Sequence, residues 1–132
     1  MWKVLIVDDN FENRELMAEI LRDVAECDLA VSGQEAIEKY NNALSLRPYQ
    51  VILLDIMMPD VDGLQALRII RKNERDHGIE LGDGVPVIMV TAHKKPYLDA
   101  FFQGCTDYIM KPIDPAKLIK KIEEKVHKPY VS

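Results

Sequence analysis

The hydrophobic residues of this chain form short unbroken runs that alternate with stripes spaced every three or four positions. Runs at 4–7, 51–54 and 87–90 are typical of strands buried on both faces, and two further short strands are predicted at 27–31, which Asp28 interrupts, and at 108–110. The stripes predict helices at 11–23, 33–42, 63–75 and 115–126. Because strands and helices alternate, and crossovers between parallel strands are right-handed, the pattern predicts an α/β fold with helices covering both faces of one parallel sheet.

Residues that favour helix starts precede the predicted helices. They are Ser32 (with Glu35 three positions later, a capping box), Asp62, Pro96 and Asp114. Pro96 and Gly104 bracket a further helix, between the last two strands. The glycine-rich stretch 76–84 is longer than a typical connection, so we expect it to form an exposed loop.

Length and composition are those of one globular domain. We expect the 132 residues to comprise a domain at 1–126 and a frayed C-terminal tail at 127–132. The 17 basic and 22 acidic residues give a net charge of -5, which argues against nucleic acid as a direct partner. No apolar run approaches the ~20 residues of a membrane helix and no leader precedes the first strand, so we expect a cytoplasmic protein. Cys27 and Cys105 lie far apart and are expected to be reduced thiols.

Three acidic residues lie at the ends of two predicted strands. Asp8 and Asp9 follow the first strand, and Asp55 ends the third. In the doubly wound order 2-1-3-4-5 these strands are neighbours, so their carboxyl ends bring the acids together. The fourth and fifth strands deliver Thr91 and Lys111 to the same edge. Because crowded carboxylates repel one another, a cation must lie among them, and oxygen ligands favour a hard divalent ion such as Mg²⁺.

This set of groups suits the transfer of a phosphoryl group onto a carboxylate. Asp55, at the centre of the sheet, is the expected acceptor. Magnesium held by Asp9, Asp55 and a backbone carbonyl just after Asp55 would bridge the carboxylate and the phosphoryl group. Lys111 would pair with Asp55 before transfer and with a phosphoryl oxygen afterwards. The Thr91 hydroxyl would donate to another phosphoryl oxygen and draw the loop after the fourth strand inward.

Five segments occur in an order that carries a family resemblance. They are Val7–Asn10, Leu54–Pro59, Asp62–Leu64, Val90–Ala92 and Asp107–Pro112. With them, nearly the whole chain resembles a response-regulator receiver domain of two-component signalling, of the chemotaxis-receiver type. The resemblance implies a flavodoxin-like fold, and the strand order given above rests partly on it. It also implies that a sensor histidine kinase or a phosphotransfer protein phosphorylates Asp55, with Met57 supplying the metal-binding carbonyl and Asp8 acting on the metal through water.

The resemblance also implies a conformational switch. Tyr108 would turn inward when Thr91 moves, and the Lys111–Pro112 peptide bond would be cis. Met57 and His93 lie beside the path by which water would reach the phosphorylated acid. We therefore expect these two side chains to set the lifetime of the modification.

Two surfaces are expected to meet other proteins. The fourth helix, the fifth strand and the last helix carry aromatic residues and lysines, a mixture that suits a downstream protein target or a phosphorylation-dependent dimer, and equally a solvated helix. Those residues are Tyr97, Phe101, Phe102, Tyr108, Lys117, Lys120, Lys121 and Lys125. Receiver domains generally meet their phosphodonor around the first helix, which here carries Asn10, Asn13, Arg14 and Met17.

Each site residue also has a purely structural explanation. Asp8 and Asp9 could cap the first helix, and Asp55 could begin a turn. Thr91 could be an ordinary strand-end residue, and Lys111 a solvated lysine. A shared functional site is the explanation that accounts for the positions of all five residues together.

Two other functions remain open. A pseudo-receiver would bind protein partners without phosphorylation, which the complete set of acids with Thr91 and Lys111 disfavours. A phosphohydrolase of the haloacid-dehalogenase type also forms an aspartyl phosphate, but it places a second acid two residues after the nucleophile that follows its first strand. This chain has Asn10 at that position. We therefore expect a switch that catalyses only its own phosphorylation and dephosphorylation.

Overall fold

Five parallel strands form a sheet in the computed structural model, which describes residues 1–55, 63–80, 82–92 and 104–126. The strands are β1 (Trp2–Val7), β2 (Ala25–Ala30), β3 (Val51–Asp55), β4 (Val87–Thr91) and β5 (Asp107–Met110). Their order, β2-β1-β3-β4-β5, is the one predicted, and each neighbouring pair is parallel. β1 and β3 therefore lie side by side, with Val7 opposite Leu54 near their carboxyl ends.

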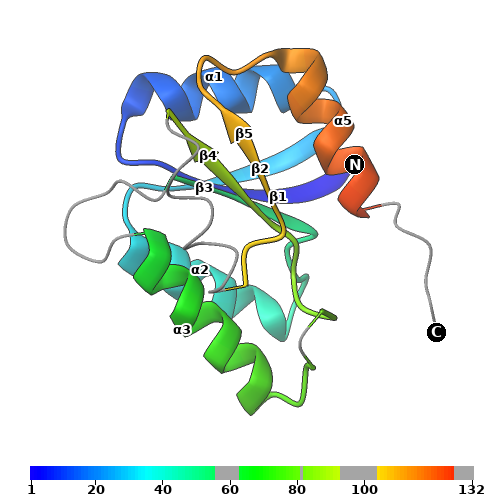
Figure 1. Ribbon diagram of the computed structural model, residues 1–132. Helices are drawn as coiled ribbons and strands as arrows, with labels where there is room; N and C mark the ends of the chain where they lie inside the picture. Colours follow the sequence, from blue (N-terminus) through cyan, green and yellow to red (C-terminus); the bar gives the residue numbers. More distant parts are fainter. Residues whose placement is uncertain (56–62, 81, 93–103, 127–132) are drawn as a thin grey trace.

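Helices cover both faces of this sheet. Those described are α1 (Phe11–Leu21), α2 (Gly33–Leu44), α3 (Gly63–Asp76) and α5 (Pro115–Val126). In Figure 1, α1 and α5 lie on one face, and α2 and α3 on the other. The helix expected between Pro96 and Gly104 and the tail expected at 127–132 fall outside the described residues. No helix among those described combines the length and the apolar character needed to cross a bilayer.

The sheet separates two hydrophobic cores, because successive strand residues point to opposite faces. Val4 and Ile6 of β1 belong to the core under α1 and α5, and Leu5 and Val7 to the core under α2 and α3. All four side chains are fully buried. This two-sided burial explains why the strand is an unbroken apolar run rather than an alternating one.

Several element boundaries differ from the prediction by one or two residues. α1 ends at Leu21, two residues before the predicted end at 23, and Leu16 within it is 47% exposed. Adjacent helical residues point about 100° apart, so a sheet that covers Met17 leaves Leu16 in solvent. β2 ends at Ala30 rather than Val31, which is exposed.

Side chains cap the helix starts as their chemistry requires. Ser32 Oγ accepts a hydrogen bond from the Glu35 N–H at 3.2 Å, and Asp114 Oδ1 accepts one from the Ala116 N–H at 3.0 Å. Asp62, expected to cap α3, falls outside the described residues. Ser32 and Asp114 thus cap their helices as predicted, whereas Glu35, the second residue of the predicted capping box, pairs with Lys39 at 3.4 Å.

The described residues of 76–84 are mostly exposed, as predicted, and hydrogen bonds to Glu74 anchor the end of this connection between α3 and β4. Glu74 of α3 is buried, and its Oε2 accepts hydrogen bonds from the Tyr40 hydroxyl at 2.9 Å and the Val85 N–H at 2.7 Å. Its Oε1 pairs with Arg71 Nη1 at 2.7 Å. Because a buried carboxylate needs such donors, Glu74 fixes the end of the connection to α2 and α3.

Candidate functional site

The carboxyl ends of β1 and β3 bring three acidic residues together. Asp8 and Asp9 follow Val7, and Asp55 follows Leu54, the residue opposite Val7 in the sheet. One carboxylate oxygen from each of the three acids lies within 4.8 Å of the other two. Asp8 and Asp55 are buried and Asp9 is exposed, so the cluster is open to solvent on one side.

Asp8 is the most deeply buried of the three acids. Its Oδ1 accepts a hydrogen bond from the Asn10 N–H at 2.9 Å, while its Oδ2 accepts none from the described residues. Burial raises the pKa of the Asp8 carboxyl; the Asn10 N–H opposes this rise, Asp55 adds to it and Lys111 opposes it. Among the described residues this buried carboxylate oxygen has no hydrogen-bond donor, which favours a positive charge beside it.

Lys111 places one ammonium group between two of these acids. Its Nζ lies 3.6 Å from Asp8 Oδ2 and 3.7 Å from Asp55 Oδ2. The Lys111 N–H donates to the Thr91 carbonyl at 2.7 Å, which extends the pairing of β4 with β5 and brings the buried Thr91 to the same edge. The Lys111–Pro112 peptide bond is cis.

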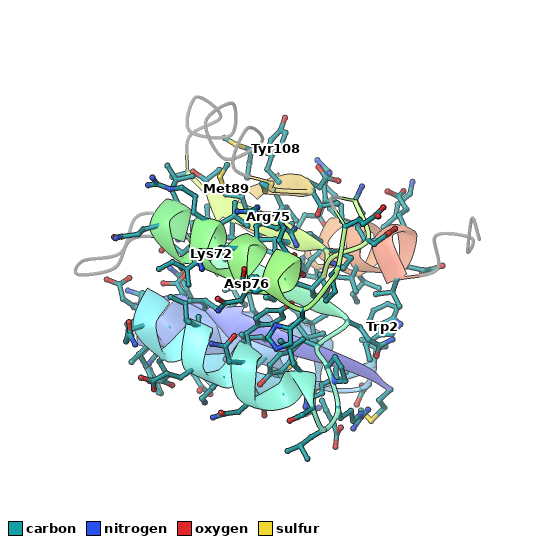
Figure 2. The ribbon with its side chains drawn as sticks, turned by 90° about the horizontal axis from the view of Figure 1, so that it is seen from below. Trp2, Lys72, Arg75, Asp76, Met89 and Tyr108 are labelled. Carbon is teal, nitrogen blue, oxygen red and sulfur yellow. The ribbon has the colours of Figure 1, made fainter. Side chains whose placement is uncertain are left out.

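Tyr108 lies on the edge strand β5, opposite Met89 of β4. In Figure 2 its side chain extends outward from the strand, and its ring centroid is 5.7 Å from Lys121 Nζ. Met57 and His93, expected to supply the metal-binding carbonyl and to set the lifetime of the modification, fall outside the described residues.

The donor set fits a hard divalent cation. Three carboxylates with one ammonium leave an excess of negative charge at the sheet edge. Oxygen ligands are the ones that Mg²⁺, Ca²⁺ and Mn²⁺ prefer, and a Mg²⁺ site keeps several waters, which the open side at Asp9 can admit. The observation that most favours a cation is the buried Asp8 Oδ2, to which no described residue donates a hydrogen bond.

Two residues at the start of α1 hold the acid cluster in ways that the sequence did not predict. Asn10 donates its N–H to Asp8 and also caps α1, because its Oδ1 accepts from the Asn13 N–H at 2.9 Å. The cap is therefore Asn10 rather than Asp8 or Asp9. Arg14 Nη1 donates to the Asp8 carbonyl at 2.8 Å. The sequence signal for the first is the preference of asparagine for helix caps; nothing in the residue pattern points to the second.

Comparison with known proteins identifies the family. A model of the response regulator receiver domain matches residues 4–123. The chain is 40% identical over 129 residues to hybrid signal transduction histidine kinase L of Dictyostelium discoideum, covering 96% of this chain and 7% of that protein. It is 36% identical over 121 residues to signal transduction histidine-protein kinase BarA of Escherichia coli, covering 87% of this chain and 12% of that protein. The chain thus spans a small part of these curated relatives.

Solved structures of similar fold support the same assignment. The receiver domain of a sensor histidine kinase from Pseudomonas aeruginosa, which has a magnesium ion coordinated in its active-site cleft, has a TM-score of 0.79 at 26% identity, covering 96% of this chain and 98% of that one. A chemotaxis protein of Vibrio cholerae has a TM-score of 0.77 at 27% identity, covering 94% of this chain and 98% of that one. The chain belongs to the response regulator receiver family and is a receiver domain of two-component signal transduction.

Proposed function

We propose that the chain accepts a phosphoryl group on Asp55 from a phosphohistidine of a sensor histidine kinase or phosphotransfer protein. The supporting observation is the convergence of Asp8, Asp9 and Asp55 within 4.8 Å, with the Lys111 ammonium 3.7 Å from Asp55. Asp8 is too buried to meet an incoming phosphorus, and Asp9 has no ammonium beside it among the described residues. Asp55 is slightly exposed and partly neutralised, which suits a nucleophile.

In the proposed reaction, a carboxylate oxygen of Asp55 attacks the phosphorus of the phosphohistidine. The O–P bond forms as the N–P bond breaks, and the electron pair stays on the imidazole nitrogen, which then takes a proton. Lys111 pairs with Asp55 at rest and is close enough to shift to a phosphoryl oxygen as negative charge arrives. Thr91, buried at the same edge, supplies a hydroxyl for a second phosphoryl oxygen.

Mg²⁺ is the proposed cofactor. Asp8, Asp9, Asp55 and the Met57 carbonyl are the groups that would hold it, with Asp8 acting through water. When bound, the ion would neutralise the carboxylates and the incoming phosphoryl oxygens. The magnesium-containing receiver domain from Pseudomonas aeruginosa supports this choice of ion.

The proposed consequence of phosphorylation is a rearrangement at the β4–β5 edge. Thr91 would move toward the phosphoryl group, and Tyr108 would leave its outward position and its contact with Lys121 to turn inward. Met57 and His93 would set the lifetime by controlling the approach of water. A downstream protein, or a second copy of the chain in a phosphorylation-dependent dimer, would read the altered surface.

Two features favour a switch over the other functions. Asn10 occupies the position where a haloacid-dehalogenase-type phosphohydrolase has its second acid, so the chain would catalyse only its own phosphorylation and dephosphorylation. The complete set of acids and ammonium disfavours a pseudo-receiver.

The free thiols Cys27 and Cys105 suit a reducing compartment, and we place the protein in the cytoplasm.

Incubation with an acyl phosphate and Mg²⁺, followed by intact-mass measurement, tests the proposal. We expect the addition of one phosphoryl group, its loss when Mg²⁺ is chelated, and its absence in Asp55→Asn. Asp76→Asn is the matched control, because Asp76 is an exposed acid on α3 that pairs with Lys72 at 3.0 Å (Figure 2). It should be labelled like the wild type. No labelling of the wild type would favour the pseudo-receiver, and steady release of phosphate from organic esters would favour the phosphohydrolase.

A further inference from the structure

Arg14 places a positive charge near the N-terminus of α1, where a helix favours negative charge. It is the fourth residue of the helix, and the partial positive charge of a helix N-terminus favours acidic side chains there. Helical side chains lean back toward the N-terminus, which directs the Arg14 guanidinium toward the turn between β1 and α1. In Figure 1 this turn lies at the left, where the blue strand passes into the blue helix. The Arg14 guanidinium therefore needs a favourable interaction to offset this position.

That contact is with the backbone of the acid cluster. Arg14 Nη1 donates to the Asp8 carbonyl at 2.8 Å in a part-buried hydrogen bond. The guanidinium carbon also lies 5.8 Å from the ring centroid of Phe11, whose side chain is 65% exposed. Arg14 is therefore held between a ring and a peptide group. Because the peptide bond is planar, fixing the Asp8 oxygen orients the whole peptide that joins Asp8 to Asp9.

Asp9 depends on this backbone contact more than Asp8 does. The Asp8 carboxylate is held directly, by the Asn10 N–H at 2.9 Å. The Asp9 carboxylate is exposed, and no hydrogen bond or ion pair from the described residues holds it. The backbone therefore sets the point from which this side chain reaches the cluster, and Arg14 is a side chain that holds the preceding peptide.

We propose that Arg14 is a positioning residue of the metal site, which orients Asp9 as a ligand by fixing the Asp8–Asp9 peptide. The inference rests on the proposed function, since it takes the acid cluster to bind a divalent cation. A purely electrostatic effect of Arg14 predicts the opposite result: a guanidinium beside three carboxylates lowers their affinity for another cation, so its removal would tighten metal binding. The direction of the change in metal affinity therefore distinguishes the positioning role from the electrostatic effect.

Mn²⁺ binding, followed through the electron paramagnetic resonance signal of the free ion, provides the test, because Mn²⁺ shares the oxygen-ligand preference of Mg²⁺. Arg14→Met removes the guanidinium and keeps an unbranched stem. We expect its association constant to fall roughly tenfold, the order found when a group that orients a metal ligand is lost. Arg14→Lys keeps the charge and can offer one N–H to the carbonyl, so it should recover part of the affinity.

Arg22→Met is the matched control. Arg22 follows the last residue of the same helix and pairs with Glu19 at 3.2 Å, so this variant loses one positive charge far from the acids. Its Mn²⁺ affinity should equal that of the wild type. Thermal unfolding of each variant checks that it is folded, and Arg14→Gln replaces Arg14→Met if the latter shows no cooperative transition.

Folded Arg14→Met protein that binds Mn²⁺ as tightly as the wild type, or more tightly, would overturn the inference. If the wild type binds Mn²⁺ and is phosphorylated on Asp55 while Arg14→Met matches it in affinity, only the positioning role of Arg14 fails. If the wild type neither binds Mn²⁺ nor accepts phosphate, the proposed function fails and this inference fails with it.

Discussion

The Lys111 ammonium lies 3.6 Å from Oδ2 of Asp8, a buried carboxylate oxygen that accepts no hydrogen bond from the described residues. The same ammonium is 3.7 Å from Asp55. One cation thus faces two buried acids, which leaves the negative charge of the cluster only partly neutralised. Stability without metal and affinity for metal should therefore change in opposite directions when an acid is removed.

Replacing Asp8 by asparagine should stabilise the metal-free protein. Burial, with Asp55 adding to it, raises the pKa of the Asp8 carboxyl, so the ionised form is held at a cost. We expect Asp8→Asn to raise the free energy of unfolding by about 1 kcal/mol at neutral pH and to weaken Mg²⁺ binding. Urea unfolding in the presence of a chelator measures the first effect, and calorimetric titration with Mg²⁺ the second. A loss of metal-free stability would show that repulsion among the acids is unimportant.

Replacing Lys111 by methionine should have the opposite effect on stability. Without the ammonium, Asp8 and Asp55 face each other uncompensated, and the free energy of unfolding should fall by about 1–2 kcal/mol, less than for a fully buried pair because the Lys111 side chain is 25% exposed. Saturating Mg²⁺ should stabilise this variant more than it stabilises the wild type.

Lys72→Met is the control for Lys111→Met. Lys72 is an exposed lysine on α3, visible in Figure 2, that pairs with Asp76 at 3.0 Å. Its loss should change the free energy of unfolding by no more than about 0.5 kcal/mol. An equal gain from Mg²⁺ in all three proteins would contradict the role given to Lys111.

A side chain at Gly84 should destabilise the connection between α3 and β4. A Cβ there would overlap Oε1 and Cδ of Glu74, and that carboxylate cannot move without losing the donors that hold it. We expect Gly84→Ala to lower the free energy of unfolding by roughly 2–3 kcal/mol. At Gly82 a Cβ would meet no atom within 4 Å, and only the strain of its φ of +95° remains, about 1 kcal/mol. Urea unfolding of both variants checks the order; a larger loss at Gly82 would show that Glu74 is free to move.

Stability should fall as the pH rises above about 9, where the ionisation of buried thiol and phenol groups begins in the unfolded chain. Burial raises the pKa of Cys27 from 9.0 to about 11. Burial also raises the pKa of Tyr40 and Tyr49 above 10.0, and hydrogen bonds to Glu74 and Asp28 add to the rise. The folded state thus keeps protons that the unfolded chain has lost, so the free energy of unfolding decreases with pH in this range. Below it, the groups are protonated in both states and add no pH dependence.

Urea unfolding at intervals between pH 8 and pH 11 measures this loss, and the same series on Tyr40→Phe isolates one contribution. The phenylalanine variant should lose less stability across the range, because it has no phenol to ionise. A flat profile in the wild type would mean that these groups ionise as readily in the folded protein as in the unfolded chain.

The sequence predicted the features that depend on local pattern. Unbroken apolar runs marked strands buried on both faces, and Ser32 and Asp114 marked helix starts. The buried Glu74 was not predicted, because its partners Tyr40 and Val85 are 34 and 11 residues away and only the folded chain brings them close. The hydrogen bond from Val85 also anchors the end of the exposed loop.

The contact between Arg14 and the Asp8 carbonyl was also not predicted, but the reason is different. Every residue has a backbone carbonyl, so no residue type at the receiving end signals the bond. The acids at the ends of β1 and β3 could be predicted to meet, because the strand order places these two strand ends side by side. The contact from Arg14 depends instead on the path of the turn, which the pattern of side chains does not encode.

The chemical location of the phosphoryl group tests the central claim most directly. After reaction with an acyl phosphate and Mg²⁺, borohydride reduction converts a phosphorylated aspartate to homoserine, and peptide mass spectrometry identifies the converted residue. We predict conversion at Asp55 and nowhere else, and none when Mg²⁺ is chelated. Conversion at Asp8 or Asp9, or a phosphoryl group recovered on a histidine, would contradict it.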